Sequence, residues 1–298
     1  MILEPVSNFP LARLTTVRTG GSAEFFARAG SGAELDELLA WAAARGLAVA
    51  VVGSGSNLLV ADEGVGGLVL KLDRELARIE PRGTGIRCGG GARLPAVAAR
   101  AAEVGLAGIE FGVNIPGTVG GAVRMNANAY GGELARVLAW VEVHTALGRQ
   151  RRRPDELDLV YRASNLGPEE VVARAEFVLE PAPSEQVRAR LADLRRRRHA
   201  AQPKGIRTFG STFKNPPGQT AGLLLAGAGA TALRVGGARF SPKHANFVEN
   251  TGTATTADIV ALMAAGRRLV AERWGLELEA EVQTLGPVRF PWRGGPVD

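Results

Sequence analysis

The chain has 298 residues, 46% of them hydrophobic and 22% charged, which excludes global disorder and allows two or three domains. One cysteine and three histidines exclude an internal disulfide and argue against a zinc site of the usual kind. No apolar run reaches the about 18 residues of a membrane span, and no signal-peptide pattern is present. We therefore expect a soluble, cytoplasmic protein with no metal and no membrane partner.

Hydrophobic spacing predicts the secondary structure of the first part of the chain. The expected elements are a helix over 33–45, a buried strand over 47–52, a helix over 94–104, and strands over 137–145 and 171–180. Cys88 falls at the end of a short strand, where we interpret it as a buried structural thiol.

Pro181 and Pro183 interrupt this pattern and mark a domain boundary. The elements expected beyond them are a basic helix over 184–199, a glycine-rich stretch to 237, a helix over 258–274 capped by Thr255 or Thr256, and a strand over 276–285. Strands and helices do not alternate regularly, so the predicted fold class is α+β. We predict an N-terminal domain over 1–182, with subdomains of about 1–72 and 73–182, and a C-terminal domain over 183–298.

Glycine clusters in the first half of the chain are typical of backbone that approaches a ligand closely. The first is Gly53-Ser54-Gly55-Ser56-Asn57-Leu58, a tight turn whose amides and hydroxyls suit a pyrophosphate. It is not a P-loop, because no Gly-Lys-Ser/Thr follows, and Leu58 stands at the third glycine of the dinucleotide fingerprint. Taken alone, this segment is equally compatible with an ordinary loop.

Two further clusters are Pro116-Gly117-Thr118-Val119-Gly120-Gly121 and Arg18-Thr19-Gly20-Gly21. Three clusters in one half of a chain favour a large nucleotide cofactor over coincidence.

Seven short motifs, in a fixed order, resemble those of one enzyme family. Three of them are Gly53-Ser54-Gly55-Ser56-Asn57-Leu58-Leu59, Ile115-Pro116-Gly117-Thr118-Val119-Gly120-Gly121 and Tyr161-Arg162-Ala163-Ser164. The other four are Gly210-Ser211-Thr212-Phe213-Lys214-Asn215-Pro216, Gly236-Gly237-Ala238, Lys243-His244-Ala245-Asn246-Phe247 and Leu278-Glu279-Ala280-Glu281-Val282. Together they resemble the UDP-N-acetylenolpyruvoylglucosamine reductases over nearly the whole chain.

The resemblance implies a FAD-binding fold of the vanillyl-alcohol oxidase type, formed by the N-terminal domain, and a C-terminal substrate-binding domain. It further implies that NADPH reduces non-covalently bound FAD, which then reduces UDP-N-acetylglucosamine enolpyruvate to UDP-N-acetylmuramate, a precursor of peptidoglycan. The implied cofactor-binding residues are Gly53, Ser54, Gly55, Ser56, Asn57, Leu58, Pro116, Gly117, Thr118, Gly120, Gly121 and Asn126.

The catalytic trio of the family maps onto Arg162, Ser211 and Glu281. Hydride addition leaves negative charge on the neighbouring carbon and its carboxylate, which a fixed arginine and a glutamate would stabilise. The serine hydroxyl would donate a proton to that carbon. Without the resemblance, the three residues would pass for a surface arginine, a turn hydroxyl and a solvent-facing strand residue.

The sequence departs from the family at two glycine positions, now Asn114 and Asn128, and we expect both asparagines to tolerate a left-handed backbone. One form of the family carries an inserted loop whose tyrosine closes over the substrate. The interval from Arg162 to Ser211 is 211 − 162 = 49 positions, which is too short for this insert. The chain therefore resembles the short form.

Lysine is rare in the chain, yet three of its four lysines lie near Ser211. A compact ammonium suits phosphate or carboxylate, so the candidate substrate-binding residues are Lys204, Lys214, Asn215 and Lys243. Chance clustering is the alternative.

Two other functions deserve comparison. An alcohol oxidase of the same fold is one, but no histidine lies in the first 143 residues to carry covalent flavin. A nucleic-acid-binding protein is the other, suggested by the net charge of +6. The arginine runs at 151–153 and 195–198 contain no aromatic side chain on which bases could stack. We expect no nucleic-acid partner, and a monomer whose partners are NADPH and the UDP-sugar.

Overall fold

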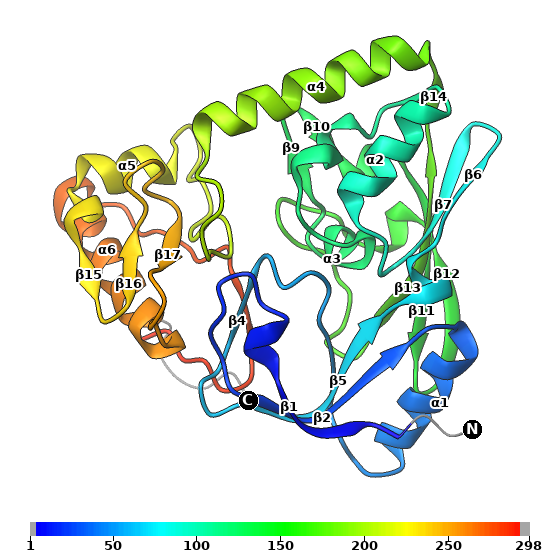
Figure 1. Cartoon of the computed structure of the whole chain (residues 1–298), viewed down its shortest axis with the longest axis horizontal. Helices are drawn as coiled ribbons and strands as arrows, with labels where there is room; N and C mark the ends of the chain where they lie inside the picture. Colours follow the sequence, from blue (N-terminus) through cyan, green and yellow to red (C-terminus); the bar gives the residue numbers. More distant parts are fainter. Residues whose placement is uncertain (1–3, 293–298) are drawn as a thin grey trace. The chain divides into compact units, whose positions relative to one another are not determined.

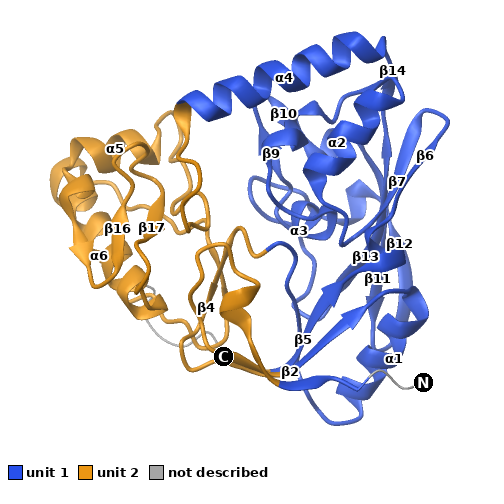
Figure 2. Ribbon diagram, in the orientation of Figure 1, with its two compact units in different colours: residues 1–7, 25–54, 67–200 blue, residues 8–24, 55–66, 201–298 orange. Residues whose placement is uncertain are grey.

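The computed structural model describes residues 4–292 of the chain, which form two compact units (Figure 2). The first unit contains the residues up to Ser7, 25–54 and 67–200, and the second contains 8–24, 55–66 and the residues from 201 onward. The units interleave along the sequence, whereas the predicted domains are contiguous. The functional boundary between 182 and 183 stays a prediction.

The first unit is built around an antiparallel five-stranded sheet in the order β12-β11-β13-β7-β6 (Figure 1). Its strands are β6 (Ile79–Arg82), β7 (Gly85–Gly89), β11 (Leu138–Thr145), β12 (Gly148–Arg152) and β13 (Val171–Val178). Helices α2 (Leu94–Glu103) and α3 (Val119–Arg124) pack against β7, and α3 also packs against β13. Their apolar side chains form a core with Ile86, Val141 and Phe177, which are fully buried.

A second sheet has the order β1-β2-β5-β3, with β3 (Val49–Val51) parallel to β5 (Val65–Leu72). Its other strands are β1 (Val6–Pro10) and β2 (Ser22–Ala29). Helix α1 (Gly32–Ala43) begins at Ser31, whose side chain accepts a hydrogen bond from the Glu34 amide, and buries Leu35, Leu38 and Leu39.

Short elements complete the first unit. Strand β8 (Leu106–Ala107) pairs with β14 (Glu180–Pro181), and β9 (Asn128–Ala129) pairs with β10 (Gly132–Glu133). Helix α4 (Ser184–Ala201) follows β14 and buries only Val187 and Leu191, because its remaining surface is largely polar.

The second unit contains β15 (Arg234–Val235), β16 (Ala238–Phe240) and β17 (Val248–Asn250), paired antiparallel in that order. Single bridges extend this pairing from Arg207 to Asn250, from Ser211 to Phe247 and from Phe213 to Ala280. Helices α5 (Ala221–Gly227) and α6 (Thr256–Trp274) contact each other, and α6 contacts β15 and β16. Their shared core includes Phe213, Phe240 and Leu262.

The predicted α+β class is confirmed, and the predicted helices are present. Thr255 is the N-cap of α6 and forms a capping box with Asp258, while Gly275 ends the helix with a left-handed backbone. None of the helices within residues 4–292 is long and apolar enough to cross a membrane.

The predicted strand over 276–285 is shorter than expected. Only β18 (Gln283–Leu285) is a strand, and it pairs in parallel with β4 (Leu58–Val60). Just before it, Ala280 forms an antiparallel bridge with Phe213. The segment changes both its partner and the direction of pairing within three residues, so one continuous ladder does not form.

Candidate functional site

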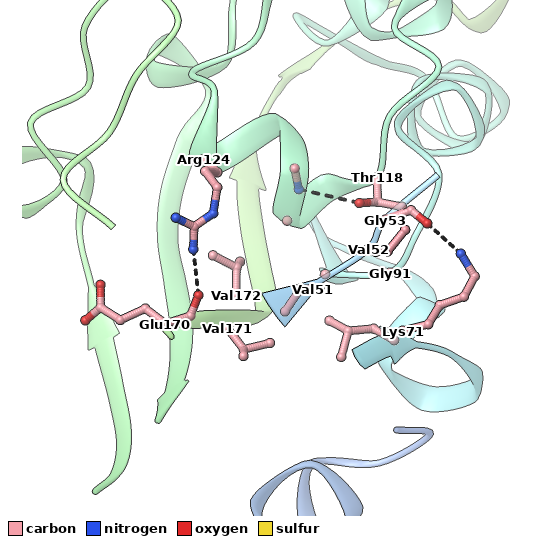
Figure 3. Close-up of a pocket in the computed structure, with 14 residues that line it drawn as sticks. Val51, Val52, Gly53, Lys71, Gly91, Thr118, Arg124, Glu170, Val171 and Val172 are labelled. Carbon is pink, nitrogen blue, oxygen red and sulfur yellow. Dashed lines mark hydrogen bonds between the residues drawn. The ribbon is translucent and has the colours of Figure 1, made fainter. Parts of the chain in front are cut away.

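A pocket in the first unit lies between strands β3 and β5, the turn at Gly90-Gly91 and the start of α3 (Figure 3). Its lining residues are Val51, Val52, Gly53, Lys71, Leu72, Gly90, Gly91, Thr118, Gly120, Gly121, Arg124, Glu170, Val171 and Val172. Four of the predicted cofactor-binding residues, Gly53, Thr118, Gly120 and Gly121, are therefore brought together by the fold.

Glycine allows the two predicted cofactor loops to pack closely. A Cβ atom at Gly53 would lie 2.5 Å from the Thr118 hydroxyl oxygen, so a larger residue would displace the second loop. The Ser54 hydroxyl donates a hydrogen bond of 2.6 Å to the carbonyl of Pro116. The Gly120 amide donates a hydrogen bond of 2.8 Å to the Gly90 carbonyl. The loops at 53–54 and 116–121 thus form one surface.

Gly117 and Gly121 are different, because the protein itself leaves room beside them. An added Cβ would have its nearest neighbour at 3.8 Å for Gly117 and 3.6 Å for Gly121, and neither residue has a positive φ. Neither packing nor backbone conformation therefore requires glycine at these positions. A ligand pressed against the backbone would require it, so the loop fits a flat cofactor such as FAD.

The remaining predicted cofactor residues lie elsewhere. Gly55, Ser56, Asn57 and Leu58 belong to the second unit, where the Asn57 carbonyl accepts a hydrogen bond from the Gln283 amide. Pro116 lies in the first unit and is exposed. Asn126 is fully buried, and its side chain bonds to Glu133, to the Val160 carbonyl and to the Ala135 amide. A direct cofactor contact from Asn126 stays a prediction.

Arg162 lies in the first unit, is half-buried and has a left-handed backbone with φ of 61°. Its Nη1 atom donates hydrogen bonds to Asn128, at 3.3 Å to the carbonyl and 3.0 Å to Oδ1. Its guanidinium also lies 5.1 Å from the centre of the Tyr161 ring. The bonds to Asn128 attach the guanidinium of Arg162 to strand β9 and so fix its position.

Neither Asn114 nor Asn128 has a positive φ, so the left-handed backbone that asparagine would tolerate is not used at either position. Each asparagine instead uses its side chain. Asn114 donates a hydrogen bond of 2.8 Å to the Leu194 carbonyl of α4, and Asn128 accepts from Arg162. A glycine could make neither bond.

Ser211 and Glu281 lie in the second unit on neighbouring antiparallel segments, and both are half-buried. The Glu281 amide donates a hydrogen bond of 2.9 Å to the carbonyl of Thr212, the residue after Ser211. The Thr212 amide in turn donates a 2.7 Å bond to the Asn246 carbonyl. The backbone of both candidate residues is therefore fixed by strand-like pairing.

The predicted substrate-binding residues also lie in the second unit. The Lys214 ammonium is 2.6 Å from a carboxylate oxygen of Glu279, and the Asn215 side chain accepts a hydrogen bond from the Ala221 amide at the start of α5. Lys204 and Lys243 are exposed.

Sequence reasoning missed several pocket residues, notably Lys71, Gly90, Gly91 and Arg124. A signal was present for Lys71, since it is the one charged residue in the apolar run from Leu68 to Leu72. The arginine has no comparable signal. Arg124 donates hydrogen bonds to the carbonyls of Leu166, Gly167 and Glu170 and thereby holds the loop that precedes β13.

Comparisons with known proteins assign the two parts of the chain to known families. Residues 23–153 match the family described as FAD binding domain, and residues 202–285 match the C-terminal domain of UDP-N-acetylenolpyruvoylglucosamine reductase. Within residues 4–292, no cluster of His, Cys, Asp or Glu side chains could hold a metal ion. The fold and the two family matches define a FAD-containing oxidoreductase.

Curated relatives identify the family. The UDP-N-acetylenolpyruvoylglucosamine reductase 2 of Symbiobacterium thermophilum is 45% identical over 95% of this chain and 92% of its own length. The reductase of Anaeromyxobacter dehalogenans is 42% identical over 97% of this chain and 87% of its own. The crystal structure of the Thermus caldophilus reductase matches with a TM-score of 0.82 and 37% identity, covering 95% of this chain and 98% of that one. The chain belongs to the UDP-N-acetylenolpyruvoylglucosamine reductase family.

Proposed function

We propose that this protein uses NADPH and FAD to reduce UDP-N-acetylglucosamine enolpyruvate to UDP-N-acetylmuramate, a step in peptidoglycan precursor synthesis. The observation that carries the proposal is the match to named reductases over 95% of the chain or more, in a fold whose glycine-lined pocket suits FAD. Bound FAD supplies hydride transfer from NADPH to the enolpyruvyl group.

The residues of the chain supply charge and a proton. Arg162 provides a fixed cation for the negative charge that develops on the substrate carboxylate and its neighbouring carbon, and Asn128 holds that cation in place. Glu281, when protonated, donates a hydrogen bond to the same substrate carboxylate and so shares this task. The Ser211 hydroxyl donates its proton to the carbon next to the carboxylate, without adding a charge to the site.

We further propose that NADPH and the UDP-sugar bind in turn to one region near Ser211. Both ligands carry phosphates, and Lys204, Lys214, Asn215 and Lys243 are the residues proposed to contact them. Lys214 is bonded to Glu279, so a phosphate there would compete with a carboxylate. We also propose that the protein is a monomer. A chain with one cysteine also suits the reducing cytoplasm.

The test is anaerobic mixing of the purified protein first with NADPH and then with the enolpyruvyl UDP-sugar. We expect the flavin spectrum to bleach in the first step and to return in the second. A colourless protein, or flavin that the UDP-sugar does not reoxidise, would contradict the proposed function.

Ser211→Ala separates the two steps. Loss of a general acid typically costs about 10²–10⁴-fold, so reoxidation by the UDP-sugar should slow by that factor while reduction by NADPH stays near normal. Ser211→Cys should recover part of the rate, because a thiol can also donate a proton. Equal slowing of both steps would show that Ser211 binds ligand or supports the fold.

Ser241→Ala is the matched control for this experiment. Ser241 also neighbours Phe247, whose carbonyl accepts a hydrogen bond from the Ser241 amide. Its hydroxyl is buried and has no hydrogen-bond partner within residues 4–292, so its removal should leave both steps unchanged.

A further inference from the structure

Lys71 is a charged residue in an otherwise apolar strand. Its neighbours in β5, Leu70 and Leu72, are buried, as are Leu68 and Val69. The side chain reaches the pocket of the first unit, where it lies beside Gly53 (Figure 3). Placing an ammonium there removes it from water, which costs free energy unless an anion or several acceptors compensate.

The protein compensates this ammonium only in part. An ammonium has three donors, and Lys71 uses one in a 2.5 Å hydrogen bond to the Gly53 carbonyl, the one such bond of this group within residues 4–292. No carboxylate of that part of the chain lies within ion-pair distance of Lys71. Burial lowers the pKa of Lys71, and the nearby cations Arg28 and Arg93 lower it further, while Asp73 opposes them.

The other charged groups of the pocket are already engaged. Arg124 donates to three backbone carbonyls. Glu170 accepts hydrogen bonds from Arg152 and from the Gly167 amide. Arg124 thus directs three of its five N–H donors to the protein backbone, whereas Lys71 directs one of its three and keeps two for a ligand. Its position beside the first glycine cluster, with two further cations nearby, suits an anion with several oxygen acceptors.

We propose that Lys71 binds the diphosphate of FAD. The inference rests on the proposed function, since it requires that this pocket hold FAD. Lys71 has a second effect, because its bond to the Gly53 carbonyl fixes the loop that packs against Thr118. It is thus a cofactor-binding residue that the glycine motifs do not contain.

The test measures FAD affinity directly. Apoprotein of the wild type, Lys71→Met and Lys71→Arg is titrated with FAD, and binding is followed by flavin fluorescence. A hydrogen bond to a charged group contributes about 1.5–3 kcal/mol, so Lys71→Met should raise the Kd for FAD about 10- to 100-fold. Lys71→Arg keeps the charge and should stay much closer to the wild type.

Arg28→Gln is the matched control. Arg28 lies near Lys71 and contributes positive charge, but it is exposed, pairs with Asp73 and does not line the pocket. Its loss should change the Kd for FAD far less than Lys71→Met. Equal effects of the two variants would overturn the proposed contact and leave only a general electrostatic influence.

Two further measurements separate ligand binding from a purely structural role. Apoprotein of Lys71→Met should unfold near the wild-type temperature, while the rise in unfolding temperature on adding FAD should shrink, because ligand stabilisation follows affinity. Raising KCl should weaken FAD binding more steeply in the wild type than in Lys71→Met, since an ionic contact is screened.

Several outcomes would overturn the proposal. The first two are a Kd for FAD that is unchanged in Lys71→Met, and a salt dependence of FAD binding that is equal in Lys71→Met and the wild type. The others are FAD binding by Lys71→Arg that is as weak as that of Lys71→Met, and a Lys71→Met substitution that lowers the unfolding temperature of the apoprotein as much as that of the holoprotein. A wild-type apoprotein that binds no FAD would instead refute the proposed function.

Discussion

The Asn128 side chain accepts a hydrogen bond from Arg162, the candidate catalytic arginine. The family resemblance predicts glycine at position 128, and glycine has no side chain that could accept this bond. Replacing it by alanine removes the Oδ1 acceptor at 3.0 Å from Nη1 of Arg162 and leaves the weaker backbone contact at 3.3 Å. A hydrogen bond to a charged group contributes about 1.5–3 kcal/mol, and partial exposure of Arg162 favours the lower end. About 1.4 kcal/mol corresponds to tenfold in rate.

We therefore expect Asn128→Ala to slow flavin reoxidation by the UDP-sugar about tenfold. Reduction of the flavin by NADPH should change little, since no carboxylate needs stabilising in that step. Stopped-flow absorbance of the flavin measures both rates, and circular dichroism checks the fold.

Asn165→Ala provides the control, because the Asn165 side chain lies near Arg162 in the sequence but bonds to Glu156 and Asp158. It should leave reoxidation unchanged. Wild-type reoxidation in Asn128→Ala, or equal losses in the two variants, would refute the idea that Asn128 positions Arg162.

Three predictions concern stability and reactivity. Gly266→Ala should lower the free energy of unfolding by about 1–3 kcal/mol in urea titrations, because its Cβ would lie 2.6 Å from the buried Phe240 ring; unchanged stability would contradict this packing. The hydrogen bond from Arg152 lowers the pKa of Glu170 below its ordinary value, so Glu170→Gln should be less stable than the wild type at pH 7. This difference in stability should vanish as the pH falls through the folded-state pKa of Glu170. A difference that persists at low pH would show that the charge of Glu170 is not its cause. Burial raises the pKa of Cys88 to about 12, so the native protein should resist a thiol reagent at pH 8 that modifies the unfolded chain, and rapid native labelling would show that Cys88 is accessible.

Local patterns in the sequence were enough to predict most helices and the glycine-rich loops. The spacing of apolar residues predicted the bounds of α1, α2 and α6 to within a few residues, because the helical period depends only on side chains close together in the sequence. The glycine clusters predicted the loops that we propose bind the cofactor, since close backbone approach excludes side chains at those positions.

Contacts between residues that are far apart in the sequence became visible only in the folded protein. Arg162 and Asn128 are 34 positions apart, and no local sequence pattern predicts the hydrogen bond between them. In the sequence, Lys71 is one charged residue in an apolar run. Only the folded structure shows that its ammonium lies beside Gly53. The strand expected over 276–285 was divided by its two partners, Phe213 and β4, which no local pattern specifies. Periodicity records which face of an element is buried, whereas pairing and pocket geometry depend on what that face meets.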